Sequence, residues 1–170
     1  MLKRINLWAP WRIGYIKGLA EQHDCFICHN IKNPQADADN LVLWRTTLSI
    51  VMFNRFPYNN GHLLICPLKH ASDFEQLSDA ELLELNKLTA AAQKLLKLTI
   101  QPHGFNVGMN FGRCAGAGLP GHLHVHIVPR WDGDTNFMEV CSGTDVISQG
   151  MKELYQQLKE ASEKNNLPGI

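Results

Sequence analysis

The stretch His122-Leu123-His124-Val125-His126-Ile127-Val128-Pro129 alternates histidine with aliphatic residues over the length of a short strand. Side chains on a β-strand point alternately to opposite faces, so the three histidines are expected on one face and the aliphatic residues on the other. The pattern predicts a strand with one face in the core and a row of imidazoles on the other face.

Other short segments of alternating or β-branched residues, each bounded by turn residues, predict further strands at 41–45, 48–54, 62–66 and 105–111, beside 122–128. Ser78 and Glu81 have the spacing of a capping box and open an apolar series with helical periodicity, which predicts a long helix. A second helical pattern places one set of apolar residues on one face: Ile147, Met151, Leu154 and Leu158. The predicted fold class is α+β, an antiparallel sheet of about five strands with two main helices.

The chain has 170 residues, with 16 Lys plus Arg and 16 Asp plus Glu, a size typical of one domain. A net charge of zero argues against an overall basic surface for duplex nucleic acid or for an anionic membrane. Cys25 and Cys28 belong to a set of five cysteines, and their spacing suits metal or redox chemistry better than a secreted disulfide framework. The first twenty residues, broken at Pro10, contain neither a signal-peptide core nor a membrane span. We therefore expect a cytoplasmic protein.

Three interpretations fit the row of histidines. The first is the polar outer face of an ordinary strand, which has no need for three histidines within five positions. The second is a metal site built from imidazoles two residues apart, which requires further ligands. The third is nucleophilic catalysis, in which a neutral imidazole attacks phosphorus and forms a covalent nucleotidyl intermediate. That role needs one ring nitrogen free to attack while the other donates to a partner that fixes the tautomer.

A glycine-rich connection at 112–121 precedes the histidines, and its backbone amides can form an anion-binding site, although a plain hairpin loop has the same composition. No Asp or Glu occurs from Leu85 through Trp131, whereas five basic residues do: Lys87, Lys94, Lys97, Arg113 and Arg130. An acid-free loop beside a histidine strand favours a polyphosphate ligand.

The segment GHLHVHIVP, residues 121–129, resembles the signature of the histidine triad family. Residues 59–70, with a glycine-histidine pair before a strand, also resemble that family. Within it, WAPWR, GMN followed by the glycine loop, and PRWDGDTNFM are most similar to the fragile histidine triad branch and to bacterial diadenosine tetraphosphate phosphorylases. The resemblance implies a catalytic domain at 23–140. It leaves an N-terminal aromatic segment at 1–22, expected to pack on the domain, and a C-terminal helix and tail at 141–170.

Position by position, the resemblance implies that His124 is the nucleophile and that His126 contacts the phosphates. Asn54 matches a residue that contacts the nucleoside sugar, and Asn110 one that reaches the phosphate or the leaving group; a turn residue at a strand end is the other interpretation of Asn54.

The chain departs from the family pattern before the triad. Ala117-Gly118-Leu119 stands where many members have Gly-Gln-Ser/Thr, so a side-chain amide and a hydroxyl are missing. Phosphate binding is then expected from the backbone amides of Gly116, Gly118 and Leu119. The acceptor of the nucleotidyl group, water or inorganic phosphate, stays open.

Cys25 and Cys28 form half of a tetrahedral zinc site, with nearby histidines as local candidates for the other half. Zinc-containing members of the family imply a full set of Cys25, Cys28, His70 and His122, which predicts a structural Zn²⁺ ion; a reduced thiol pair without metal is the alternative. No organic cofactor is expected.

The leading functional hypothesis is cleavage of dinucleoside polyphosphates, such as diadenosine tetraphosphate, through a nucleotidyl intermediate on His124. The alternatives are an adenosine phosphoramidate hydrolase, a nucleotide-binding sensor with weak catalysis, and a purely metal-binding protein. The expected partners are a nucleotide substrate and, by resemblance, a second copy of the chain in a homodimer.

Overall fold

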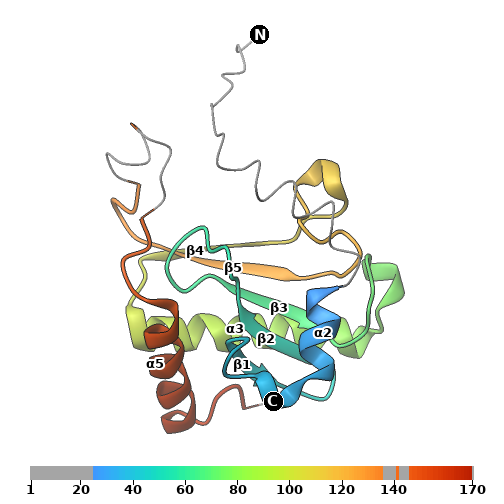
Figure 1. Ribbon diagram of the computed structural model, residues 1–170, viewed down its shortest axis with the longest axis horizontal. Helices are drawn as coiled ribbons and strands as arrows, with labels where there is room; N and C mark the ends of the chain where they lie inside the picture. The colour runs from blue at the N-terminus through green and yellow to red at the C-terminus, as the bar shows by residue number, and fades with distance from the viewer. Residues whose placement is uncertain (1–24, 136–140, 142–145, 170) are drawn as a thin grey trace.

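The computed structural model describes residues 25–135, 141 and 146–169, which build a five-stranded antiparallel sheet with helices on both faces (Figure 1). The strand order across the sheet is β1-β2-β3-β5-β4, and every neighbouring pair is antiparallel. The strands are β1 Val42–Arg45, β2 Ser49–Phe53, β3 Leu63–Pro67, β4 Gly104–Gly108 and β5 Val125–Arg130. The predicted α+β class is confirmed, and the expected packing of residues 1–22 lies outside the described residues.

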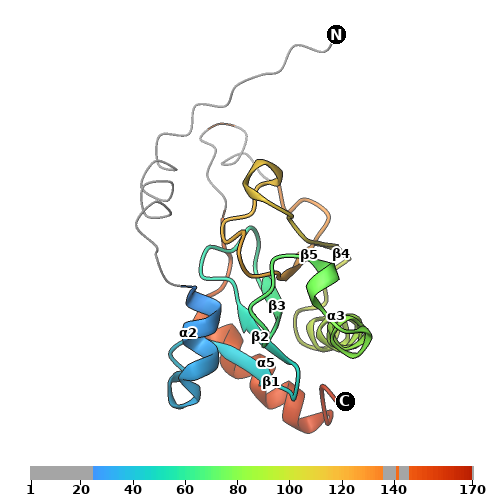
Figure 2. The same cartoon turned by 90° about the vertical axis from the view of Figure 1, so that its right-hand side faces the viewer.

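Helix α3, Asp79–Ile100, crosses one face of the sheet, and α5, Met151–Lys164, packs beside it (Figure 2). The predicted capping box is present, since Ser78 Oγ accepts from the Glu81 amide and the Glu81 carboxylate accepts from the Ser78 amide at 2.7 Å. The main core lies between these helices and the inner face of the sheet, and it includes Leu88, Leu95, Val125, Ile127, Leu154 and Leu158.

A short helix, α2 Phe26–Lys32, covers part of the opposite face of the sheet (Figure 2). It buries Ile27 in a second core cluster with Ile50, Met52, Leu64 and Cys66. The sequence reasoning missed this helix because seven residues are too few to show helical periodicity. Three 3₁₀ turns complete the described elements: η1 Pro34–Ala36, η2 Phe74–Gln76 and η3 Arg113–Ala115.

The predicted strand at 122–128 begins later than expected, at Val125. In the β3–β5 register Ile65 pairs with Val125, so Pro67 would come opposite Leu123 if the ladder continued. Pro67 has no amide hydrogen to donate, and Leu123 donates instead to Ala71 O at 2.6 Å. His122 and His124 therefore precede the strand, and the expected single row of three imidazoles is broken.

The other predicted boundaries differ from the structure by smaller amounts. The strand predicted at 105–111 ends at Gly108, so Asn110 lies in the connection beyond it. The second helix begins at Met151 rather than Ile147, although Leu154 and Leu158 are buried on one face as predicted. No helix in the described part of the chain is both long and apolar enough to cross a membrane.

Candidate active site and metal centre

Three histidines meet on the sheet face opposite α3. Val125 and Ile127 belong to the core under α3, so the alternation along β5 turns His126 to the other face. His62, immediately before β3, is fully buried and joins His126, with ring centroids 5.2 Å apart. His124 lies next to His126 at 4.8 Å between centroids. The sequence reasoning placed His62 at a strand start but gave it no role, although the adjacency of β3 and β5 brings it into the site.

His124 is held in one tautomer by the backbone. Its Nδ1 lies 2.8 Å from His122 O, and because a carbonyl can only accept, Nδ1 carries the proton. The lone pair of the neutral ring is then at Nε2, which forms no hydrogen bond with any described residue. Burial lowers the pKa of His124, against the opposing effect of the carbonyl hydrogen bond, so the ring is neutral at pH 7. A neutral imidazole with a free nitrogen is the form that attacks phosphorus.

A hydrogen-bonded chain also fixes the tautomers of His62 and His126. The Tyr58 amide donates to His62 Nδ1 at 3.1 Å, so neutral His62 carries its proton on Nε2. His62 Nε2 lies 2.9 Å from His126 Nδ1 and donates to it, which puts the proton of neutral His126 on Nε2. That nitrogen is buried and has no partner among the described residues. His126 therefore offers an unused N–H donor beside the free nitrogen of His124.

The rings of His62 and His126 both stay uncharged at neutral pH. Burial is the largest cause that lowers the pKa of His62 to about 3, followed by repulsion from His126 and His124. Burial likewise lowers the pKa of His126 to about 4, with repulsion from His124 second. At neutral pH both therefore act as hydrogen-bonding groups rather than as acids.

The loop that carries His62 is tied to the end of β5. Asn59 Nδ2 donates to Pro129 O at 3.2 Å and to the Asp134 carboxylate at 2.8 Å. Arg130 donates to both oxygens of Asp134, at 2.6 and 2.9 Å, and this ion pair is the main cause that holds the pKa of Asp134 well below its usual range. The network joins the two segments that carry His62 and His126, and the sequence reasoning did not identify it because its members are about 70 residues apart.

Gly61 gives the same loop its sharp turn. Its φ is +74°, and a Cβ at this position would lie 2.8 Å from Ile100 Cδ1 and 3.2 Å from Leu96 Cδ2. Only glycine fits both the backbone conformation and the space against α3. The turn brings His62 directly from the loop into the buried start of β3.

The two predicted asparagines lie at the edges of this group. Asn54 follows β2, where its Oδ1 accepts from the Phe56 amide at 2.9 Å and its Nδ2 lies 3.4 Å from His62 Nδ1. It is thus both a turn residue and a neighbour of the site. Asn110 is partly exposed, and its Nδ2 lies 3.9 Å from the point where a Cβ on Gly116 would be. Asn110 therefore faces the glycine loop.

The glycine loop keeps only part of its predicted anion-binding capacity free. The amide of Gly116 donates to Arg113 O at 3.0 Å within the turn η3. The amides of Gly118 and Leu119 form no hydrogen bond with the described residues, so they are open to a ligand. Gly112 and Gly116 adopt φ of +78° and +94°, conformations that side chains rarely allow, and they give the loop its compact shape.

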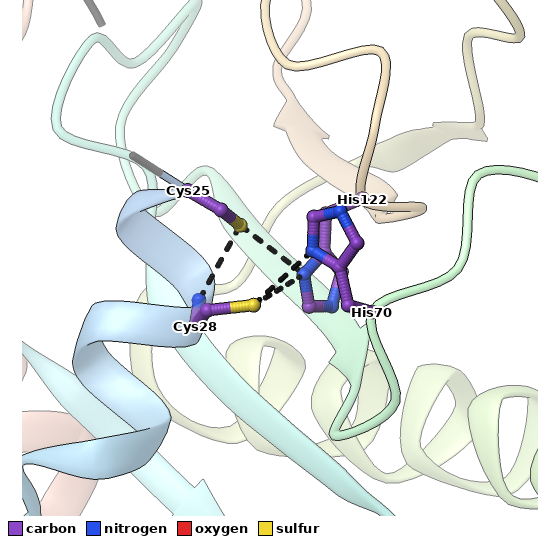
Figure 3. A group of neighbouring side chains, drawn as sticks. All are labelled: Cys25, Cys28, His70 and His122. Atoms are coloured by element: carbon purple, nitrogen blue, oxygen red, sulfur yellow. Dashed lines mark hydrogen bonds between the residues drawn. The ribbon is translucent and has the colours of Figure 1, made fainter. Parts of the chain in front are cut away.

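The predicted metal ligands come together on the same sheet face (Figure 3). Cys25 caps α2, Cys28 lies in its first turn, His70 follows β3 and His122 precedes β5. The four potential ligand atoms lie within 4.8 Å of one another, with Cys25 Sγ 3.2 Å from His122 Nδ1 and Cys28 Sγ 3.2 Å from His70 Nδ1. Two sulfurs and two nitrogens around one point suit a tetrahedral ion.

The protonation of the group also fits a cation. His122 donates from Nε2 to Pro67 O at 2.9 Å, which leaves a lone pair on Nδ1 toward the cysteines. Histidines that bind metal usually donate their other ring N–H to such a carbonyl, which fixes the orientation of the ring. Burial raises the pKa of the Cys25 thiol to about 11, so without a cation this thiol keeps its proton at neutral pH. The remaining cysteines, Cys66, Cys114 and Cys141, are free and outside the cluster.

The family model for the HIT domain matches residues 35–133. The chain belongs to the HIT, or histidine triad, family. It is 39% identical over 154 residues to the AP-4-A phosphorylase of Mycobacterium tuberculosis strain CDC 1551, covering 87% of this chain and 79% of that protein. It is 31% identical over 106 residues to the adenosine 5'-monophosphoramidase of Schizosaccharomyces pombe, covering 62% and 74% of the two chains.

Solved structures agree with the fold. A zinc-bound histidine triad family protein from Mycobacterium smegmatis superposes with a TM-score of 0.68 at 19% identity. The match covers 84% of this chain and 96% of that one. The family predicted from GHLHVHIVP is therefore confirmed, and the five-stranded HIT-type sheet with it.

The low pKa values of the buried histidines predict a loss of stability in acid. Unfolded histidines titrate near 6.5, so the unfolded chain takes up protons first as the pH falls. Stability is therefore complete above pH ~6.5 and declines as the pH falls toward about 4 for His126 and about 3 for His62. Each histidine contributes about 1.4 kcal/mol per pH unit. Urea denaturation at pH 7.5 and 5.0 measures this decline.

A substitution assigns the decline to a residue. His62→Gln is expected to reduce the stability difference between pH 7.5 and 5.0 by about 2 kcal/mol, because one titrating group is removed. An equal difference in His62→Gln and the wild type would contradict the prediction.

Proposed function

We propose that this protein cleaves dinucleoside polyphosphates of the diadenosine tetraphosphate type through a covalent nucleotidyl intermediate on His124. The observation that carries the proposal is the pair of complementary nitrogens, a free lone pair at His124 Nε2 beside an unused donor at His126 Nε2. The relationship to the AP-4-A phosphorylase of M. tuberculosis supports the substrate class.

In the first step, His124 Nε2 attacks the phosphorus of one nucleotidyl group and the bond from phosphorus to the bridging oxygen breaks. The attacking ring, now bonded to phosphorus through Nε2, becomes an imidazolium with its Nδ1 proton directed at His122 O, so the carbonyl dipole stabilises the new positive charge. The His126 Nε2–H donates to the departing oxygen as negative charge develops there. Positioning and electrostatic stabilisation supply the rate, as in phosphoryl transfer generally.

The protonation of His126 favours a polyphosphate leaving group over an amine. A nucleoside polyphosphate leaves as a stable anion and needs only a hydrogen bond, whereas the amine of a phosphoramidate needs a full proton. With its pKa lowered to about 4, His126 carries no spare proton at pH 7. Phosphoramidate cleavage, the activity named for the S. pombe relative, is therefore the second candidate.

The same argument favours inorganic phosphate as the acceptor. Water must lose a proton to become a good nucleophile, but His126 Nε2 already holds a proton and cannot act as a base without changing tautomer. Phosphate at neutral pH is already an anionic nucleophile. The amides of Gly118 and Leu119, together with the Asn110 side chain, are the groups we assign to hold the phosphates.

Replacing His124 tests the intermediate. His124→Ala is expected to reduce turnover of diadenosine tetraphosphate by at least about a thousandfold, because the nucleophile is removed. His103→Ala is the matched control at an exposed histidine. Product analysis in oxygen-18 water, with and without inorganic phosphate, identifies the acceptor.

Each product pattern has a distinct meaning. ADP formed only when phosphate is present supports phosphorolysis. Oxygen-18-labelled AMP identifies water as the acceptor and contradicts the assignment of phosphate, and turnover retained in His124→Ala removes His124 as the nucleophile. Binding of the dinucleotide without any product would instead indicate a nucleotide sensor.

We propose that Cys25, Cys28, His70 and His122 hold a structural Zn²⁺ ion. The donor set and spacing support zinc, because two thiolates and two imidazoles fill a tetrahedral shell and leave no position for substrate. Such an ion joins α2 to the segments before β5 and after β3. Reduced thiolates suit a reducing compartment, and we accordingly assign the protein to the cytoplasm.

Metal analysis tests the zinc site. The purified protein is expected to hold one zinc ion per chain, measured by mass spectrometry of the digested sample, and Cys28→Ser is expected to lose most of it and to unfold at a lower temperature. Cys114→Ser, at an exposed cysteine outside the cluster, is the control and keeps the full content. One zinc ion per chain in Cys28→Ser would show that the ligand set is wrong.

We also propose a two-fold dimer through β4, the open edge of the sheet. The β1 edge is covered by α5, since Tyr155 Oη donates to Val42 O and Lys159 Nζ to Leu43 O, both at 3.1 Å. At the other edge β4 has β5 as its one partner among the strands that the structure describes, and Val107 is 45% exposed. An open edge with an exposed apolar residue is a surface for pairing with a second copy.

Light scattering on a size-exclusion column tests the dimer. The wild-type protein is expected at twice the chain mass, and Val107→Lys at the mass of one chain, because a charge on an edge strand opposes pairing. Val107→Thr keeps the size and strand preference and is expected to stay dimeric. A wild-type protein at the mass of one chain would refute the dimer.

A further inference from the structure

Tyr58 lies over two of the site histidines with much of its side chain in solvent. Its ring centroid is 4.7 Å from that of His62 and 5.9 Å from that of His126, with an interplanar angle of 22° to His126. The residue is nevertheless 58% exposed. One face of the ring is therefore stacked on the imidazoles, and the other is open.

The Tyr58 ring lies on the side of the site that we assign to the leaving group. In the proposed reaction His124 Nε2 approaches phosphorus from one side, and His126 Nε2 donates to the oxygen that departs. Tyr58 stacks on His126, and no ring contact joins it to His124 in the described part of the chain. Of the two histidines assigned to the reaction, the one that Tyr58 contacts is therefore His126, which we assign to the leaving oxygen.

We propose that the open face of Tyr58 stacks on the base of the second nucleoside, the one that departs with the polyphosphate. This inference rests on the proposed function and extends it to a second base subsite. A nucleobase presents a flat π-face of a size that matches a tyrosine ring, and stacking on an aromatic side chain requires no particular base. The flexible phosphate chain lets the second base fold back onto the loop that carries Tyr58.

Two features of the loop suit it to this role. The Tyr58 backbone amide is fixed by its hydrogen bond to His62 Nδ1, and the loop is tied through Asn59 to Asp134, so the ring is presented from a held backbone. The Tyr58 hydroxyl forms no hydrogen bond with the described residues, so the ring face rather than the hydroxyl is the functional part. A phenylalanine would therefore replace it.

The test compares substrates that differ in the second nucleoside. Tyr58→Leu, which keeps an apolar side chain but removes the ring, is expected to lower kcat/KM for diadenosine tetraphosphate more than for adenosine 5'-phosphoramidate. The excess loss is expected to be about 5- to 150-fold, the value of one stacked base, and to appear mainly in KM. Tyr58→Phe is expected to restore the wild-type ratio between the two substrates.

A purely structural role for Tyr58 predicts a different result. If the ring only shields His126, Tyr58→Leu slows both substrates by the same factor, and this outcome overturns the proposal. Failure of Tyr58→Phe to restore the ratio would also overturn it, because the hydroxyl would then be the contact.

A binding measurement separates this inference from the proposed function. In the His124→Ala background the dinucleotide stays uncleaved, so its binding can be measured by calorimetric titration. Adding Tyr58→Leu is expected to weaken the binding of diadenosine tetraphosphate by a larger factor than the binding of AMP. If the wild type fails to cleave the dinucleotide, the proposed function fails, while this comparison still decides whether Tyr58 binds a second base. Equal weakening of both ligands, or none, would refute the subsite.

Discussion

The hydrogen bond from His124 Nδ1 to His122 O determines what the site can do, because it directs the free lone pair of His124 to Nε2. The residue that supplies this carbonyl also turns its own ring into the Cys25–Cys28 cluster. One residue therefore belongs to both centres, through its backbone on one side and its imidazole on the other. An ion held by the cluster would restrain the position of that carbonyl, so metal binding and the geometry of His124, the proposed nucleophile, are connected through the side chain and backbone of a single residue.

Backbone groups, acting directly or through one neutral histidine, set the tautomers of these four histidines without any charged side chain. Pro67 O fixes His122, His122 O fixes His124, and the Tyr58 amide fixes His62, which in turn fixes His126. A carboxylate partner would fix a tautomer equally well, but it would also raise the pKa of the imidazole and favour its charged form. Carbonyls and amides hold the rings without adding a negative charge beside a polyphosphate, which agrees with the acid-free stretch around the triad.

The sequence predicted the helices and strands better than the contacts between segments that lie far apart in the chain. Local patterns located the five strands and both main helices, because alternation and capping are properties of neighbouring residues. The resemblance supplied the four-residue metal set, which the structure brings within 4.8 Å. The strand start at Val125, the helix α2 and the pairing of His62 with His126 were missed, because each depends on contacts between distant segments. The effect of Pro67 on the β3–β5 ladder could not be predicted either, because it depends on which residue of the other strand lies opposite the proline.

The same use of backbone groups in place of side chains applies before the triad, where this chain lacks the glutamine and the hydroxyl of many family members. In this chain Gly118 and Leu119 offer unused amides at that place, and an amide stabilises a phosphate oxygen without a side chain. A leaving group that departs as a polyphosphate anion needs no acid, so a neutral His126 is sufficient. Phosphoramidate cleavage, in which the amine leaving group needs a proton, is the reaction that we expect to be slowed most by the loss of the glutamine and the hydroxyl. In the proposed reaction, the open amides of the loop suit the phosphate oxygens and the neutral His126 suits an anionic leaving group.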